Sequence, residues 1–362
     1  MKLRIPILLS LILLALVVPA TAQVKSSRAE LDALIDREGK TPPPWFKDTP
    51  LNYPKTLDLA WPEGPPVGGW NNQKNVGQFM WDVINPNPNR WREGVRLMHH
   101  LLNMHKDDPE KRERIMLTLC HIYHDLLEDY ARAAFWYRAV GVEKDPAEYA
   151  RSAVILAECY GRLGYRSEAL KLLAKVPPSL SQAKLLGDLG ETDRGLKMAL
   201  AETDDDPQGY AALVAGDICR QTGRFQDALK HYQAVLDIEV PAKNPNGRLI
   251  QNRNRAEANV STIKAFELFD PKKVADGKYV AASQGYEGPV EVSVTMKSGR
   301  IDKVAVTNHK EKQFYSAISD TTAQILKKQS VKGVDTTSNA TITSEAIINA
   351  TAKALANRKS SD

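Results

Sequence analysis

Cysteine is scarce in this chain, with three in 362 residues and no C-x-x-C pair among them. This excludes the zinc-ribbon, thioredoxin-type and c-type haem motifs, all of which need closely spaced cysteines. Cys120, Cys159 and Cys219 each lie in an apolar, helical pattern, which favours buried thiols. The sequence leaves open a disulfide between two of them.

Other common functional signatures are also missing. No G-x-G-x-x-G turn occurs, so the chain shows no site for a nicotinamide dinucleotide. We find no nucleophile triad or acid/base pair that would nominate a catalytic residue. The formal net charge is +5, and it falls to +3 without Lys2 and Arg4, which is too mild for a nucleic-acid partner. A stand-alone enzyme is therefore not predicted.

Only one apolar run is long enough to be considered as a signal peptide or a membrane anchor. Lys2 and Arg4 precede an apolar stretch over residues 5–18, and Ala20-Thr21-Ala22 forms an A-x-A cleavage site. This pattern predicts a signal peptide over residues 1–22, cleaved before Gln23, and hence an exported protein. An uncleaved anchor is the alternative, but the run is short for a membrane span.

Residues 23–90 are rich in Pro, Gly, Asn and Trp, as in "TPPPWFKDTP" and "WPEGPPVGGW". Such segments do not continue helices or central strands, yet they carry too many aromatic residues for a free linker. We predict an extended arm that lays its Trp side chains on the helices that follow. A carbohydrate- or ligand-stacking surface is the alternative, although no carboxylate pair accompanies it.

Residues 91–269 are helical and repetitive. "LAECYGRLGYRSEALKLLAKV" and "AGDICRQTGRFQDALKHYQAV" align, each with a Gly five residues before an Ala. This resembles the tetratricopeptide repeat, in which paired helices meet at small residues; those residues are here Ala133, Ala169, Gly195 and Ala228. We expect an all-α tetratricopeptide-like solenoid whose concave face holds a protein or peptide. "GRLIQNRNRAEANVSTIKAFELF" would close it as a helix with a polar outer side.

Five histidines occur early in this region. His121 and His124 are three residues apart beside Cys120, a spacing that suits metal ligands. No second ligand cluster appears elsewhere in the chain, and scattered histidines are ordinary on helical surfaces. We therefore predict no metal site.

After "FDPKKVADGKY" the pattern changes from helical to alternating. "PVEVSVTMKSGRIDKVAVTNH" predicts two strands joined by a turn at Lys297-Ser298-Gly299-Arg300. Helical patterns follow in "QFYSAISDTTAQILKKQS", with Phe314, Ile318, Ile325 and Leu326 on one face, and in "SEAIINATAKALAN". Residues 272–358 thus predict a small α+β domain.

Between these last two helices lies "VDTTSNATITSEAI", which is dense in Ser and Thr. The order hairpin, helix, D-x-x-S-x-A-T, helix resembles the FMN-binding domain of peripheral subunits in sodium-pumping and related membrane NADH dehydrogenases. The resemblance implies FMN linked through its phosphate to the last Thr, installed by an exported, Mg-dependent flavin transferase that uses FAD. The matching residues are Asp335, Ser338, Asn339, Ala340 and Thr341. Asn339 stands where the family has Gly, and "NHKEKQFY" replaces its E-T-P stretch.

Elementary chemistry agrees with this assignment of Thr341. The last helix should begin within Thr341 to Ser344, and free N–H groups at a helix N-terminus favour a phosphate. Thr343 or Ser344 would donate further hydrogen bonds to it. Alone, the stretch would also serve as a Ser/Thr-rich cap.

N-glycosylation is a competing interpretation. Asn259, Asn339 and Asn349 each begin an N-x-[ST] triplet. Such triplets arise readily by chance in Asn- and Thr-rich stretches. The resemblance also implies a bacterial envelope, periplasmic or extracellular, where ordinary N-glycosylation is uncommon.

Together these features predict an exported electron-transfer flavoprotein within a membrane-associated redox system. Its partners would be the flavin transferase, a redox partner protein or quinone-type carrier, and a protein or peptide on the helical repeats. The alternative is a non-redox envelope scaffold that works through the repeats alone. A hydrolase or carbohydrate-binding protein using the Trp-rich arm is a third possibility, for which no catalytic residue is nominated.

Overall fold

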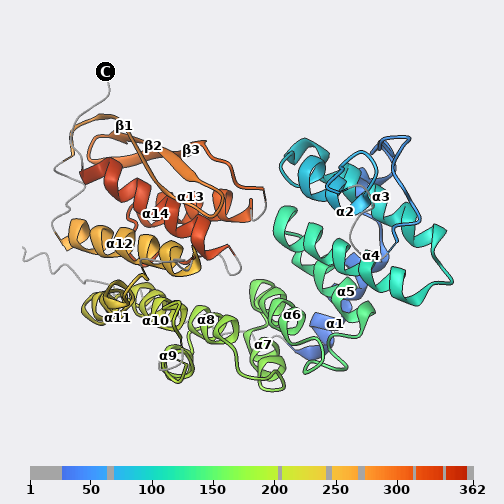
Figure 1. Ribbon diagram of the computed structural model, residues 1–362, viewed down its shortest axis with the longest axis horizontal. Coiled ribbons are helices and arrows are strands. Elements are labelled where there is room, and N and C mark those ends of the chain that lie inside the picture. Colours follow the sequence, from blue (N-terminus) through green and yellow to red (C-terminus); the bar gives the residue numbers. More distant parts are fainter. Residues whose placement is uncertain are drawn as a thin grey trace, which may run out of the picture.

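The computed structural model describes residues 27–62, 69–202, 206–241, 247–267, 274–312, 315–336 and 340–356. The predicted signal peptide lies outside these residues. The chain forms a helical region followed by a small domain with a three-stranded antiparallel sheet. In Figure 1 the helices follow an arc from α3 to α11, and the C-terminal domain lies over α10 and α12.

The described chain begins with a helix, α1 (Arg28–Lys40), which packs against α5. A capping box starts it, because Ser27 accepts a hydrogen bond from the Glu30 N–H while the Glu30 carboxylate accepts one from the Ser27 N–H. Leu31 and Ile35, one turn apart, are fully buried. The predicted extended arm is therefore wrong for residues 28–40, where the cap and the helical spacing outweigh the Pro-rich context that follows.

The rest of the N-terminal segment consists of short turns. They are η1 (Pro44–Phe46), α2 (Val76–Phe79), η2 (Met80–Ile84) and η3 (Pro88–Arg90). Trp61 is 8% exposed, and the guanidinium of Arg114 lies 4.7 Å from its ring centroid. Trp45 and Trp91 are partly buried against the same core. Trp70, which is 65% exposed, does not pack as predicted.

Consecutive helices then pack as pairs: α4 with α5, α6 with α7, α8 with α9, and α10 with α11. Ala133, Ala169 and Ala228 are fully buried. A Cβ on Gly195 would lie 2.5 Å from the Ala183 carbonyl oxygen, so the backbones of α8 and α9 approach too closely for any side chain there. The helices are α3 (Trp91–Met104), α4 (Pro109–His121), which continues as the π-helix η4 (Ile122–Leu126), α5 (Tyr130–Val140), α6 (Ala150–Arg162), α7 (Arg166–Leu173), α8 (Leu180–Asp188), α9 (Thr192–Leu200), α10 (Tyr210–Gln221), α11 (Phe225–Asp237) and α12 (Gly247–Glu267).

α12 carries polar residues on a buried side as well as on its outer side. The helix contacts α10 and α11 on one side and α14 and β1 of the C-terminal domain on the other. Arg255, Asn259 and Thr262 are at most 5% exposed. The predicted polar outer side is present at Gln251, Asn254 and Glu257, which are exposed, and the C-terminal domain covers a second polar side that the sequence did not indicate.

The C-terminal domain contains β1 (Gly277–Gln284), β2 (Pro289–Lys297), β3 (Arg300–Asn308), α13 (Ser316–Lys328) and α14 (Thr341–Ala356), with strand order β1-β2-β3. Ser298 and Gly299, at φ 52° and 70°, make the predicted turn between β2 and β3. α14 packs on β1 and β2, and α13 packs on β3. The alternating Val290, Val292 and Val294 are fully buried beneath them. The predicted α+β arrangement is confirmed.

All three cysteines are free and buried, as the helical patterns indicated. The disulfide that the sequence left open is not formed. Among the described residues, no helix combines the length and apolar character needed to cross a bilayer.

Candidate cofactor-binding site

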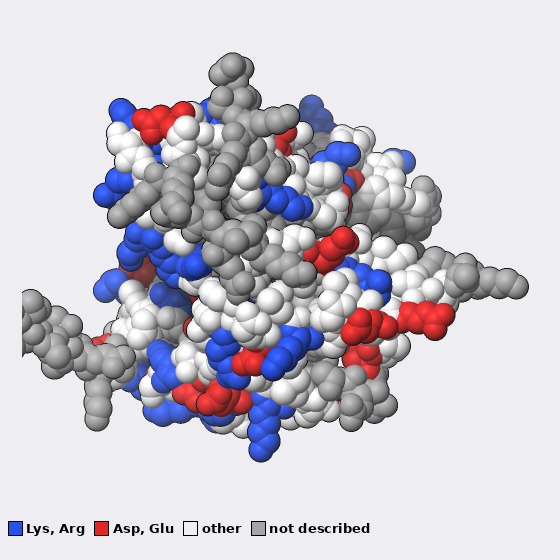
Figure 2. Space-filling view, turned by 90° about the vertical axis from the view of Figure 1, so that its left-hand side faces the viewer, with Lys and Arg blue, Asp and Glu red and all other residues white. Residues whose placement is uncertain are grey.

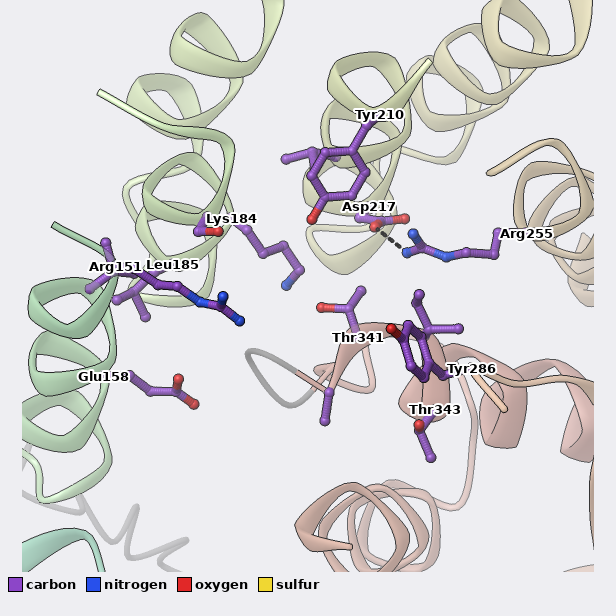
Figure 3. A pocket seen from close by; sticks show the side chains of 15 residues that line it. Arg151, Glu158, Lys184, Leu185, Tyr210, Asp217, Arg255, Tyr286, Thr341 and Thr343 are labelled. Carbon is purple, nitrogen blue, oxygen red and sulfur yellow. Dashed lines mark hydrogen bonds and ion pairs between the residues drawn. The ribbon is translucent and has the colours of Figure 1, made fainter. Parts of the chain in front are cut away.

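A cavity of about 320 Å³ lies between the helical region and the C-terminal domain. Its volume is within the range of small-molecule sites. Helices α6, α8, α10 and α12 supply one wall, and the loop after β1 and the start of α14 supply the other (Figure 3). The lining residues are Arg151, Val154, Glu158, Ser181, Lys184, Leu185, Tyr210, Val214, Asp217, Arg255, Tyr286, Ala340, Thr341, Ile342 and Thr343.

Thr341 is the first residue of α14 and lines this cavity. Figure 3 shows its hydroxyl pointing toward Lys184 on the opposite wall. The Ser344 N–H donates to the Ala340 carbonyl at 3.0 Å. The N–H groups of residues 341–343 therefore precede the first intrahelical bond, as at any helix start. The predicted beginning of the helix is confirmed, and the first amides of α14 lie at the cavity together with the Thr341 hydroxyl.

The other hydroxyls of the motif are placed differently. The Thr343 hydroxyl donates to Glu311 Oε2 at 2.9 Å, and the backbone N–H of Glu287 donates to Glu311 Oε1 at 3.2 Å. Burial raises the pKa of the Glu311 carboxyl. Ser344 is fully buried and is absent from the cavity lining. Glu311, inside "NHKEKQFY", does not line the cavity but holds the lining residue Thr343, a supporting contact that sequence reasoning missed.

Asp335 lies beside the cavity without lining it. Its carboxylate accepts a hydrogen bond from the Gln221 side chain of α10, and its backbone N–H donates to Gln324 Oε1 of α13 at 2.8 Å. Asp335 therefore links the loop before α14 to the helical region. Ser338 and Asn339, the next predicted motif residues, lie outside the described residues.

The environment of Asp335 disfavours its charged form. Burial raises the pKa of its carboxyl to about 7, and the carboxylate of Asp188 adds to the effect. Lys184 and Arg162 oppose the shift but do not cancel it. The carboxyl therefore changes charge near neutral pH at the interface between the two parts of the protein.

Two cations from the helical region face Thr341 across the cavity (Figure 3). Lys184 is 6% exposed and pairs with Asp188 one turn later in α8. Burial opposes its charge, but the nearby carboxylate of Asp188 outweighs burial and raises the pKa of Lys184. Arg151 is exposed and has no ion pair or hydrogen bond within the described part of the chain. This wall therefore offers positive charge opposite a helix N-terminus, a combination suited to an anion.

A buried ionic group closes the cavity near α12. Arg255 Nε lies 3.0 Å from Glu345 Oε2, and its Nη2 lies 3.5 Å from Asp217 Oδ2. The Tyr232 hydroxyl donates to Asp217 Oδ1 at 2.8 Å. Burial and the Glu345 carboxylate raise the pKa of Asp217 well above its usual range. The group ties α10, α12 and α14 together at the cavity wall.

The two described glycosylation triplets belong to the same interface. The Asn349 side-chain amide donates to Asn259 Oδ1 at 2.8 Å, and Arg220 Nη1 donates to the same oxygen at 2.6 Å. Asn259 is 0% and Asn349 2% exposed. Neither amide is accessible for glycosylation in the folded protein, and Asn339 lies outside the described residues.

The histidines considered for a metal site are engaged with carboxylates. His121 and His124 both contact Asp125, and His124 Nε2 lies 3.4 Å from Glu158 Oε2. Burial opposes the charge of His124, but Asp125 and Glu158 outweigh it and raise its pKa to about 10. Across the described ranges, no three His, Cys, Asp or Glu side chains gather in an arrangement for a metal ion.

Charge on the outer surface is mixed. Figure 2 shows Lys and Arg interspersed with Asp and Glu over the described part of one face. No field of one sign covers the visible described residues, so the cationic wall of the cavity is a local feature.

The C-terminal part of the chain is similar to a known protein family. Residues 285–356 match the family model of the FMN-binding domain. An uncharacterized protein of Treponema pallidum (strain Nichols) is 36% identical over 109 residues, which are 30% of this chain and 30% of that protein. The match thus spans less than a third of the relative's length. No solved structure matches the chain. The FMN-binding domain predicted at the C-terminus is confirmed.

Proposed function

We propose that this chain is an exported electron-transfer flavoprotein that carries FMN joined through its phosphate to the Thr341 hydroxyl. The observation that carries the proposal is the place of Thr341. It lies inside the range that matches the FMN-binding domain, begins a helix and opens into a cavity between the two parts of the protein. The isoalloxazine ring of FMN takes up and releases one or two electrons when bound.

The residues around Thr341 fit a phosphate and a ring system. The free N–H groups at the start of α14 suit the phosphate, and Lys184 and Arg151 balance its charge from the opposite wall. Ala340 also lines the cavity, and its small side chain leaves room beside the hydroxyl. Tyr210 and Tyr286, 39% and 42% exposed, present aromatic faces at the mouth. The helical region is therefore part of the cofactor site.

The helical region, the N-terminal segment and the partner proteins also have roles in this function. We infer that the helix pairs form a tetratricopeptide-like solenoid, and that residues 1–22 direct export to a bacterial periplasm or the outside. A flavin transferase would load Thr341. A redox partner protein or quinone-type carrier would then exchange electrons with the cofactor. The cavity face of α6, α8 and α10 is already covered by the protein's own domain, so a further protein or peptide would bind other faces of the repeats.

Changing the acceptor residue tests this proposal. The full chain, produced in a host that exports it together with a flavin transferase, should gain the mass of FMN less water on the Thr341 peptide. Thr341→Val should lose this mass and the yellow colour entirely, because the Thr343 hydroxyl is held by Glu311 and Ser344 is fully buried. Thr307→Val, at an exposed Thr on β3 of the same domain, serves as the control and should remain fully flavinylated.

A colourless wild-type protein with unmodified Thr341 would contradict the proposal. The non-redox scaffold would then be the better account of the helical region. Flavin that stays attached in Thr341→Val would instead move the acceptor to another residue.

A further inference from the structure

Two separate pockets flank the helices α4 and α6. One is the cofactor cavity, which Glu158 of α6 lines. The other, of about 560 Å³, is open at the outer surface and is lined by residues of α4, among them His121. Its lining residues are Glu110, Glu113, Arg114, Leu117, Thr118 and His121. Glu158 and His121, which are the two ends of a row of contacting side chains, therefore lie in different pockets.

Close contacts connect the four side chains, although His124 Nε2 makes no hydrogen bond in this arrangement. His121 Nδ1 contacts one oxygen of the Asp125 carboxylate, and His124 Nδ1 contacts the other. On the far side of the same imidazole, His124 Nε2 lies 3.4 Å from Glu158 Oε2. The π-helix η4, which contains His124 and Asp125, continues α4 directly from His121. π-Helical turns of this kind occur frequently at functional sites.

The exposed fraction of these four residues decreases steadily from His121 to Glu158. The His121 side chain is 31% exposed, whereas the whole residues Asp125, His124 and Glu158 are 8%, 3% and 2% exposed. Other groups border the relay without interrupting it. The Tyr130 ring packs edge-on against the imidazole at 5.6 Å, and Arg162 Nε lies 3.5 Å from the second Glu158 oxygen.

Stability alone does not account for this arrangement. Desolvating an imidazole and two carboxylates costs free energy, and apolar side chains of similar volume are often at least as stabilising. Buried titratable groups with specific charged partners are instead enriched at sites that move protons. Here they connect the surface to a cavity for a redox cofactor whose reduction consumes protons.

We propose that His121, Asp125, His124 and Glu158 form a proton relay from the outer pocket to the cavity beside Thr341. The inference rests on the proposed function, because the relay serves the reduction of a flavin held there. It adds a second task for the helical region, which would supply protons while electrons arrive from the redox partner.

Each transfer balances within the side chains. Once the 3.4 Å contact shortens to a hydrogen bond, the Nε2–H bond of His124 breaks as an O–H bond forms on Glu158. Glu158 would then pass that proton to a reduced flavin in the cavity and regain its negative charge. The imidazole, left with a proton on Nδ1, turns about its Cα–Cβ and Cβ–Cγ bonds together so that its bare Nε2 faces Asp125. A proton from water in the outer pocket passes through His121 and the Asp125 carboxyl to that nitrogen. The net change is one proton moved inward.

The charge state of His124 suits the start of this cycle. Its pKa, raised to about 10, keeps the imidazole protonated across the neutral range. The relay therefore starts with a transferable proton on His124. The proton leaves when electrons enter the cavity, because the added negative charge favours proton transfer towards Glu158.

The test follows protons and electrons separately in the FMN-loaded full-length protein. A laser flash generates reduced 5-deazariboflavin as the electron donor. Visible absorbance reports cofactor reduction, and a pH-indicator dye in weak buffer reports proton uptake. In the wild type, uptake should keep pace with reduction. In Glu158→Gln, uptake should slow by at least about 100-fold, at the lower end of typical proton-transfer contributions.

His121→Ala tests the exposed end of the relay and carries less risk to folding. It should slow proton uptake similarly, and imidazole added to the solution should restore the rate by occupying the open outer pocket. Glu110→Gln, at an exposed carboxylate of the same pocket, is the matched control and should behave as the wild type. A purely structural role of His121 would not be rescued by imidazole.

The outcomes separate the two proposals. Unchanged proton uptake in both His121→Ala and Glu158→Gln would overturn the relay and leave the flavoprotein assignment intact. Slowed uptake in His121→Ala without rescue by imidazole would also overturn it, even if Glu158→Gln failed to fold. A wild-type protein that carries no flavin would overturn the proposed function and the relay with it.

Discussion

At the scale of single residues, the site combines one hydroxyl with charge from distant parts of the chain. Thr341 begins α14, while Lys184 and Arg151 reach the same cavity from α8 and α6. Lys184 is balanced by Asp188, but Arg151 has no ionic partner in the described part of the protein. Arg151 is thus the cation whose charge is most available to a bound cofactor.

Removing this charge should lower the reduction potential of the bound flavin. In Arg151→Gln we expect a shift of roughly −30 mV, which corresponds to about 1.4 kcal/mol for a two-electron couple. The physical reason is that a nearby positive charge stabilises the more negative, reduced cofactor. Spectroelectrochemical titration measures the shift. Lys175→Gln removes the same charge outside the cavity lining and should leave the potential unchanged; equal shifts in both variants would contradict a local effect.

At the scale of elements, α12 determines how the two parts of the protein meet. Its buried polar side pairs with α10 through Asp217 and Arg220 and with α14 through Glu345 and Asn349. Each polar atom in such an interface needs a partner, because an unpaired buried group costs more than the bond itself contributes. The network therefore specifies one orientation of the C-terminal domain on the helices.

Arg255→Met should test the importance of this pairing. The substitution keeps most of the side-chain volume but leaves Asp217 and Glu345 buried without their cation. Breaking a buried pair in this way typically costs about 3–5 kcal/mol. Urea unfolding should report this loss in the free energy of unfolding. Arg37→Met breaks the surface pair with Glu38, where Arg37 is 69% exposed, and should cost less than about 1 kcal/mol. Equal losses would argue against a special role for α12.

At the scale of the whole molecule, the C-terminal domain contacts the helical region at more than one place. Asp320 of α13 pairs with Arg162 of α6 at 3.4 Å, and Ser319 donates to Glu128 at 2.7 Å. The Tyr315 hydroxyl donates to the Pro86 carbonyl oxygen at 3.0 Å. The domain thus contacts α6 and the segments at Pro86 and Glu128 in addition to α10 and α12. The cavity at Thr341 exists only while these contacts hold.

Docking of the domain should weaken as pH rises through neutrality. The raised pKa of Asp335, about 7 against an ordinary value of 3.8, means that its contribution is complete below 3.8 and lost as pH rises through 7. Because Asp335 is half-buried, we expect a change of only about 1–2 kcal/mol between pH 5 and 8.5.

Hydrogen exchange of the α13 amides, corrected for its intrinsic pH dependence, measures this opening free energy. Asp335→Asn should remove the pH-dependent part, since its side chain keeps a similar shape without a charge. Asp302→Asn, at an exposed residue of β3, should retain the wild-type pH dependence. Persistence of that dependence in Asp335→Asn would assign it to another group.

Much of the C-terminal domain could be predicted from the sequence because its signals are local. Alternation of Val290, Val292 and Val294 specifies a strand with one buried face. Ser298-Gly299 supplies the positive φ of a hairpin turn, and the Ser/Thr-rich stretch before an apolar run marks the start of α14. Each signal spans a few residues, and the structure confirms each one. The capping box at Ser27 is an equally local signal for α1, although the Pro-rich stretch behind it favours an extended segment.

The surroundings of Thr341 could not be predicted in this way. Lys184 and Arg151 read as ordinary surface cations of helical repeats, and Glu311 reads as a charged loop residue. Their roles depend on which helix face the C-terminal domain covers, and no short-range pattern encodes that choice. The sequence by itself determined the helices, the strands and the hydroxyl at a helix start, because caps and periodicity act within one or two turns. Only tertiary structure decided that this hydroxyl faces a cationic wall, because that wall is assembled from residues far apart in the chain.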